Sequence, residues 1–125
     1  MTVSTSLAGI VQPPSTTLLA TTAKTDVFTA SDKYVQKVVS VAVANEDTSS
    51  AILVTLHWHD GSSDHVFWVK EIAAKSTEIV SDIPLSLSSR VATQKIKATA
   101  GIANKVSVTV ISVADYAAQG GGGRI

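Results

Sequence analysis

Short runs of alternating apolar and polar residues recur along the chain, and turn-forming residues separate each run from the next. A period of two places one face of a β-strand against a core, and no segment shows a convincing helical period. The segments predicted as strands are Thr17–Thr21, Thr25–Thr29, Tyr34–Ala44, Ile52–His59, His65–Ile72, Thr77–Val80, Ile83–Leu87, Val91–Ala100 and Val106–Ala114.

The spacing of these segments predicts the fold class. Short strands separated by regular turn signals are typical of β-sandwiches and barrels. We expect an all-β fold over residues 17–114, a single antiparallel β-sandwich, jelly-roll-like, of about eight short strands. Residues 1–16 are expected to form an extended N-terminal arm, and the Gly-rich residues 115–125 a flexible C-terminal tail.

Tyr34–Ala44 is the strongest strand candidate in the sequence. Its alternation predicts one face of large side chains, Val39, Val41 and Val43. The other face holds smaller but still mostly apolar residues, namely Val38, Ser40, Ala42 and Ala44. We therefore expect this second face to be partly covered.

Asp60-Gly61-Ser62-Ser63 lies between two apolar runs, and an Asp-Gly pair in this position is a strong β-hairpin signal. A four-residue loop over 60–63 predicts His59 opposite Asp64, Trp58 opposite His65, and Leu56 opposite Phe67. The side chains that then share the inner face are Val54, Leu56, Trp58, Phe67 and Val69. A three-residue loop would reverse half of this assignment, because a slip of one residue exchanges the two faces of a strand.

Three histidines of this hairpin are candidate metal ligands. His57 and His59 are two residues apart on one strand and share a face, which is a common beginning of a zinc or copper site. His65 falls on the opposite face with the four-residue loop and beside them with the three-residue loop. Asp60 or Asp64 would add an oxygen ligand. A polar strand end explains the same residues more simply, so we expect no metal and no cofactor.

The two tryptophans and the terminal segments contain the candidate interface residues. In the preferred register Trp58 points into the core, while Trp68 lies on the other face and is the better interface candidate. Pro13 and Pro14 in the arm and Tyr116 near the tail are further candidates for contacts between subunits.

Composition narrows the function classes. Valine occurs 17 times and Ser plus Thr 30 times, and residues branched at Cβ suit a pleated sheet. Lys plus Arg and Asp plus Glu number 10 each, so no net charge favours nucleic acid or anionic lipid. The absence of cysteine excludes disulfides and thiolate metal sites. No apolar run approaches the ~20 residues of a membrane span.

No residue pattern predicts catalysis. None of the serines lies in a Gly-x-Ser-x-Gly turn, all three histidines fall on one hairpin, and the carboxylates are scattered near expected turns. We therefore expect a protein that is not an enzyme. A glycan-binding module that uses an exposed tryptophan, and a small metal-binding protein, remain as alternatives.

The order of several segments suggests a family. The sequence contains Val27-Phe28-Thr29-Ala30, a valine-rich strand ending at Asn45, Ala51–Leu56, Ile83-Pro84-Leu85-Ser86-Leu87, Ile96–Ala100 and Val106–Val110. Over about residues 25–113 this order resembles the small β-sandwich structural proteins of tailed bacteriophages. Those proteins decorate heads or build neck, tail and fibre-attachment parts. The hairpin rich in His and Trp and the Gly-rich tail fall outside the resemblance.

The resemblance implies a non-enzymatic virion component that is assembled in the bacterial cytoplasm. It further implies a homo-oligomer, a trimer or a higher ring, whose partners are major capsid, portal or tail proteins and whose copies pack through sheet faces and extended termini. Two arguments from the residues agree with it: sandwich faces and edges are natural association surfaces, and a net charge near zero does little to oppose self-association. Neither a membrane nor a specific nucleic acid is an expected partner.

Overall fold

The computed structural model describes residues 10–115, and this part of the chain contains strands and no helix. The strands, in chain order, are β1 (Ile10–Val11), β2 (Ser15–Leu18), β3 (Thr25–Thr29), β4 (Val35–Asn45), β5 (Ile52–His59), β6 (Asp64–Ile72), β7 (Ser76–Ser81), β8 (Ser86–Leu87), β9 (Lys95–Ala100) and β10 (Val106–Asp115). The predicted all-β fold is confirmed, although the described residues form 10 strands, more than expected.

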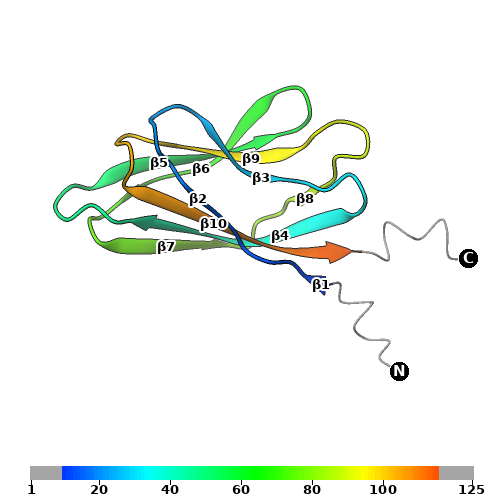
Figure 1. Cartoon of the computed structure of the whole chain (residues 1–125), viewed down its shortest axis with the longest axis horizontal. Helices are drawn as coiled ribbons and strands as arrows, with labels where there is room; N and C mark the ends of the chain where they lie inside the picture. Colours follow the sequence, from blue (N-terminus) through cyan, green and yellow to red (C-terminus); the bar gives the residue numbers. More distant parts are fainter. Residues whose placement is uncertain (1–9, 116–125) are drawn as a thin grey trace, which may run out of the picture.

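All strand pairings are antiparallel, and the strands form two sheets, which we call sheet A and sheet B. Sheet A has the order β1-β10-β4-β7, with β2 also paired to β10 and β8 to β4. Sheet B has the order β3-β9-β5-β6. Figure 1 shows the two sheets as layers, one over the other. The chain crosses between them repeatedly, so strands that are distant in sequence become neighbours.

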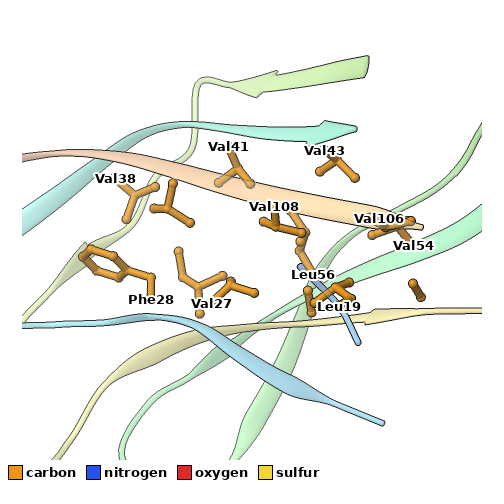
Figure 2. Close-up of a cluster of buried hydrophobic side chains, with 14 of the residues drawn as sticks. Leu19, Val27, Phe28, Val38, Val41, Val43, Val54, Leu56, Val106 and Val108 are labelled. Atoms are coloured by element: carbon orange, nitrogen blue, oxygen red, sulfur yellow. The ribbon is translucent and has the colours of Figure 1, made fainter. Parts of the chain in front are cut away.

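The hydrophobic core lies between the two sheets (Figure 2). Sheet A contributes alternate residues of its central strands, including Val41, Val43 and Val108, and sheet B contributes Val54 and Leu56, all with 0% exposure. Full burial of a side chain of this size is worth about 1.5–3 kcal/mol. Since the chain has no cysteine, packing and strand pairing stabilise the fold without disulfides.

The inner face of β4 differs from the prediction at one end. Val38 is fully buried, whereas Val39 is 36% exposed, so these two valines exchange the predicted faces. The cause is a β-bulge, because the pairing of β4 with β10 shifts register between Ile111 and Ser112. An extra residue in one strand reverses the alternation beyond it. Toward the other end of β4, Val41 and Val43 keep the predicted inner face.

The β5–β6 hairpin has the predicted four-residue loop. His59 lies opposite Asp64 and Trp58 opposite His65, which confirms the preferred register at the tip. Asp60 N donates a hydrogen bond to Ser63 O at 3.0 Å, closing the loop.

Beyond the tip a β-bulge overturns two predictions for β6. The register shifts between His57 and Leu56, so that Leu56 lies opposite Trp68 where the sequence predicts Phe67. Trp68 therefore shares the inner face with Leu56 and packs, half-buried, against the core. Val69 moves to the outer face and is 53% exposed. The sequence shows the hairpin but does not show where an extra residue enters the strand.

Part of the predicted N-terminal arm belongs to sheet A. β1 and β2 both pair with β10, and Pro13 and Pro14 lie exposed between them. Proline cannot donate a ladder hydrogen bond, so the strand is interrupted there and resumes at Ser15. β2 consequently begins two residues before the predicted segment. Residues 1–9 of the arm, Tyr116 and the tail from 116 onward lie outside the described residues.

The strand predicted over Val91–Ala100 is shorter in the structure, because β9 begins only at Lys95. Val91 is fully exposed in the loop that precedes it. Gln94 ends this loop: its N–H donates to Ser89 Oγ at 3.0 Å, and its Oε1 accepts from Ser88 N at 3.2 Å. Local side-chain hydrogen bonds of this kind compete with ladder pairing.

Candidate functional site

The outer face of sheet A contains no ionisable side chain over three consecutive cross-strand rows. Valines of β10 point into the core at every second position, so the residues between them point outward. The rows are Leu18, Ser107, Ala44 and Thr77; Thr16, Thr109, Ala42 and Ile79; and Ile111, Ser40 and Ser81. We call these three rows the uncharged face.

Exposed apolar side chains flank the uncharged face, and small or hydroxyl side chains fill its middle. Ile79 on β7 is 61% exposed and Leu18 on β2 is 48% exposed. Between them, Ala42 and Thr109 are half-buried. The Thr109 and Thr16 hydroxyl oxygens lie 3.0 Å apart, so these two hydroxyls form a hydrogen bond with each other. Covering such a surface requires no desolvation of a charge, but each hydroxyl must keep or find a hydrogen-bond partner in the contact.

Charged residues of opposite sign lie at the two ends of the uncharged face. Lys37 is exposed near the start of β4, between the buried Gln36 and Val38. Glu46 follows the last residue of β4, and its Oε2 lies 3.3 Å from Ser107 Oγ on the outer side of the sheet. On β4 the face is thus bounded by Lys37 at one end and by Glu46 at the other, while Lys105, which lies opposite Glu46, has its Nζ 3.8 Å from Asp47 Oδ1.

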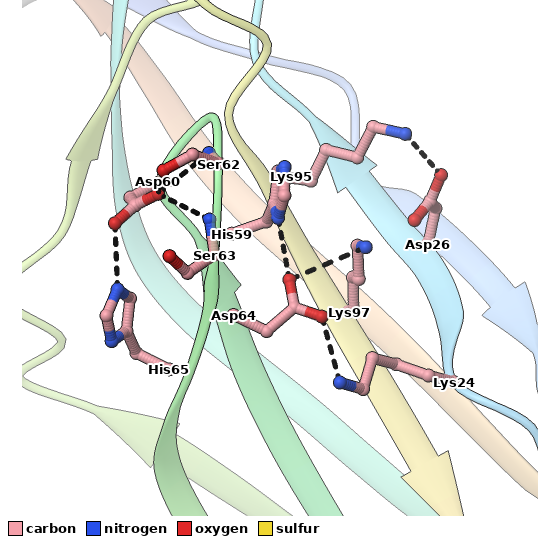
Figure 3. A network of polar contacts seen from close by, with 10 residues as sticks. All are labelled: Lys24, Asp26, His59, Asp60, Ser62, Ser63, Asp64, His65, Lys95 and Lys97. Carbon is pink, nitrogen blue, oxygen red and sulfur yellow. Dashed lines mark hydrogen bonds and ion pairs between the residues drawn. The ribbon is translucent and has the colours of Figure 1, made fainter.

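On the side of sheet B formed by β3, β9 and the end of β5, the outer face instead has charged and titratable side chains (Figure 3), whereas Leu53, Val66 and Val69 on the β5–β6 side are exposed and apolar. We call the part with charged side chains the charged face and define it by Lys24, Asp26, His57, His59, Asp64, Lys95 and Lys97. Lys95 Nζ donates to Asp26 Oδ2 at 2.7 Å across β9 and β3. Most of these charges therefore have a partner on the same face.

Asp64 is the centre of the charged face. Lys24 Nζ donates to its Oδ2 at 2.8 Å, His59 Nδ1 lies 2.7 Å from its Oδ1, and Lys97 Nζ lies 3.5 Å from the same oxygen. The hydrogen bond from Lys24, followed by that from His59, holds the pKa of Asp64 well below its usual range. This carboxylate therefore joins β6 to the β2–β3 loop, to β5 and to β9.

The hairpin loop has its own carboxylate, which stabilises the turn. Asp60 Oδ1 accepts hydrogen bonds from the backbone N–H groups of Ser62 and Ser63, both at 2.9 Å, and Asp60 Oδ2 lies 2.8 Å from His65 Nε2. The Ser63 N–H, followed by His65, holds the pKa of Asp60 well below its usual range. Asp60 is thus engaged in the loop itself.

The three histidines do not converge. His57 and His59 share the outer face, as predicted, while His65 lies on the other side of the hairpin, its ring 5.4 Å from that of Trp58. His57 is 8% exposed and its Nε2 lies 3.4 Å from Thr99 Oγ1. Within residues 10–115 no group of three His, Asp or Glu side chains is arranged to hold a metal ion.

The environment of His57 favours its neutral form. Burial lowers the pKa of His57, and the positive charge of Lys24 lowers it further, as does that of Lys97, while Asp64 opposes them. The imidazole of His57 is therefore favoured in its neutral form, near the positive charges of Lys24 and Lys97.

Neither tryptophan presents an isolated exposed ring. Trp58 and Trp68 are both half-buried against the core, and Trp58 Nε1 is buried without a hydrogen-bond partner in the described part of the chain. The prediction that Trp68 faces outward is wrong, because the bulge in β6 turns this side chain to the inner face. This removes the exposed tryptophan on which the glycan-binding alternative was based.

An open groove of about 430 Å³ lies between β4 and the segment that connects β7 to β8. The residues that line it are Lys37, Val38, Val39, Asp82, Ile83 and Pro84. One lysine and one aspartate are its ionisable groups, and the rest of the lining is apolar. The groove continues from the Lys37 end of the uncharged face and contains no serine or histidine.

The uncharged face is the surface that sequence reasoning missed as a candidate site. Its signal was the small, apolar second face predicted for Tyr34–Ala44, which includes Ser40, Ala42 and Ala44. What could not be seen is that β2, β10 and β7 extend this face on both sides, because the strands that pair are far apart in the chain.

The sequence matches no protein-family model, and no curated protein and no solved structure matches the chain. The stretch from residue 10 to residue 115 has no helix long and apolar enough to cross a membrane.

Proposed function

We propose that this chain is a non-enzymatic structural protein of a tailed-bacteriophage particle, which self-associates and packs on the capsid or on the head–tail or tail assembly. The role would be that of a decoration, cement or adaptor subunit. The observation that carries the proposal is the uncharged face of sheet A, a broad surface suited to contact with another protein.

The strand order supports a jelly-roll sandwich as the finer description of the fold. If the two-residue strands β1 and β8 are set aside, eight strands remain in two facing sheets. Their orders are β2-β10-β4-β7 and β3-β9-β5-β6, so the first and last of the eight are neighbours, as are the second and seventh. Jelly rolls of this kind build viral capsid proteins, and also lectins and cupins.

The chemistry of the uncharged face supports a role in an assembly rather than a function as an isolated monomer. Charges of both signs spread over a surface oppose unspecific association. The three rows of the uncharged face have none, and they combine exposed Ile79 and Leu18 with small and hydroxyl side chains.

Two measurements test the proposed function. Mass spectrometry of purified particles from the source should find this chain at many copies per particle. Light scattering or sedimentation of the isolated protein should show self-association that increases with concentration. A chain that is absent from particles, or that stays monomeric up to its solubility limit, would contradict the proposal.

A further inference from the structure

We propose that two copies of the chain stack face to face through the uncharged face, related by a two-fold axis near Ala42, with Lys37 of each copy facing Glu46 of the other. This inference rests on the proposed function, because it names the partner and the geometry of the self-association.

Charge complementarity selects a second copy as the occupant of this surface. Because the three rows hold no ionisable side chain, the face has no repulsion against itself. A partner with a charged surface would instead lose solvation of its charges without gaining an opposite charge in return. An isologous contact, in which the same surface is used by both copies, is also the commonest form of homo-oligomeric interface.

The charges at the two ends of the face select the orientation of the second copy. Stacked sheets keep their strand directions roughly aligned, so β4 of one copy can run with or against β4 of the other. With parallel strands, Lys37 would face Lys37 and Glu46 would face Glu46. With antiparallel strands, each lysine faces a glutamate. Opposite charges attract and like charges repel across such a contact, so the antiparallel arrangement is favoured.

The position of the axis follows from the same two residues. Lys37 and Glu46 are separated by ~30 Å along an extended strand at a rise of ~3.3 Å per residue. The midpoint lies next to Ala42, which is also a central position of the middle row, between Thr109 and Ile79. None of the ion pairs within residues 10–115 engages Lys37 or Glu46, and the Glu46 carboxylate accepts a hydrogen bond from Ser107 Oγ on the same face.

The size of the face predicts a dissociable dimer. Four strands at a spacing of ~4.8 Å, with three outward rows at ~7 Å, cover ~400 Å² per copy. The two copies together would bury ~800 Å², less than the ~1,200–2,000 Å² of a stable specific interface, so this contact is weak by itself. In a particle with many copies, repeated weak contacts of this kind reinforce one another.

Charge reversal with rescue provides the main test. Lys37→Glu alone and Glu46→Lys alone should each weaken the dimer about tenfold in sedimentation equilibrium, because each replaces two attractive pairs with two repulsive ones. The double variant Lys37→Glu/Glu46→Lys should restore the affinity, since both copies then exchange signs. Lys37→Glu combined with Glu71→Lys, a reversal at an exposed position of sheet B that restores the same net charge, is the matched control and should stay as weak as Lys37→Glu alone.

Cysteine cross-linking provides the second test, and the absence of native cysteine makes it clean. Ala42→Cys should give a covalent dimer with a bis-maleimide cross-linker that spans ~10 Å, because two copies of residue 42 face each other at the axis across stacked sheets that are ~10 Å apart, too far for a direct disulfide. Thr55→Cys, at an outward and half-buried position of a central strand in sheet B, should not.

The results distinguish this inference from the proposed function. If the protein self-associates but Lys37→Glu has no effect, or the double variant is not rescued, or Ala42→Cys fails to cross-link, then the stacking geometry is overturned and the structural role stands. If the isolated protein is monomeric at every concentration, both are overturned.

Discussion

The outer faces of sheets A and B differ in chemistry although each covers one side of the same core. On sheet B the charges pair with one another: Lys24 with Asp64, and Lys95 with Asp26. On sheet A the three central rows have hydroxyl, alanine and exposed aliphatic side chains and no charge. A net charge of zero for the whole chain therefore conceals a strong segregation between two surfaces.

This difference shows which face is complete in an isolated subunit. The ions of the charged face pair with one another, so covering that face would require further desolvation of many ions. The uncharged face gains from being covered, because its exposed apolar side chains lose contact with water. Substitutions that reverse these properties should therefore affect association on sheet A and folding on sheet B.

The largest expected effect is on association, from placing one carboxylate in the middle of each face. Thr109→Glu should weaken self-association by ~30-fold or more, since it leaves an unpaired charge in the contact. Thr55→Glu, a matched threonine that is also half-buried on a central strand, should leave it unchanged. Sedimentation velocity over a concentration series measures both. Equal losses in the two variants would show that the faces do not differ in this respect.

A smaller effect is expected at the exposed apolar edge of the same face. Ile79→Lys should weaken association about tenfold, because part of the ~1.5–3 kcal/mol available from burying an isoleucine is lost. Leu53→Lys is the control on sheet B, where Leu53 is 52% exposed against 61% for Ile79. Light scattering of the two proteins at equal concentration compares them, and a stronger effect of Leu53→Lys would assign the contact to sheet B.

The next effect is on the pH dependence of stability, which should change with a substitution on the charged face and not with one on the uncharged face. The lowered pKa of His57 means that the unfolded chain, with a histidine pKa near 6.5, binds more protons than the folded chain as the pH falls through that value. The contribution of neutral His57 to stability is thus present above about pH 6.5 and decreases on acidification toward pH 5.

Urea midpoints at pH 7.5 and 5.5 measure this effect of His57, and His57→Gln should reduce the difference between them. Association through the uncharged face, which has no group titrating in this range, should change little over the same interval. If His57→Gln leaves the pH dependence of stability unaltered, burial of His57 does not control it.

The smallest effect is expected from removing the central carboxylate of the charged face. Asp64→Asn withdraws the negative charge that Lys24, His59 and Lys97 share, so it should lower the melting temperature and make it less sensitive to added salt. Self-association should be unaffected. Glu71→Gln, an exposed position on the same sheet, is the control, and an equal decrease in that variant would show that the Asp64 cluster has no special stabilising role.

Local patterns in the sequence predicted much of the fold because they depend on neighbouring residues. The bounds of β5, the four-residue loop and the pairing of Trp58 with His65 all follow from alternation and one Asp-Gly turn. The bulges in β4 and β6 did not follow from it, because where an extra residue enters a strand depends on how both sheets pack. Val39 and Trp68 were placed on the wrong faces for this reason.

The candidate site was harder to predict than the fold. A cluster of His and Asp in one hairpin attracts notice in a sequence, yet the structure separates His65 from the other two histidines. The uncharged face has no conspicuous residue at all. What distinguishes it is that several strands have no charge on the same side. Two of these strands, β2 and β10, are far apart in the sequence, so their pairing is known only from the structure.

The tip of the β5–β6 hairpin limits how related sequences can diverge. Gly61 has a φ of +107°, and a Cβ placed on it would lie 2.6 Å from the Cβ of Ala92 in the loop before β9. Positions 61 and 92 therefore share the space of a single methyl group, although they are far apart in the chain. Among homologues, glycine at 61 should accompany any side chain at 92, and an insertion in either loop should appear together with a change in the other.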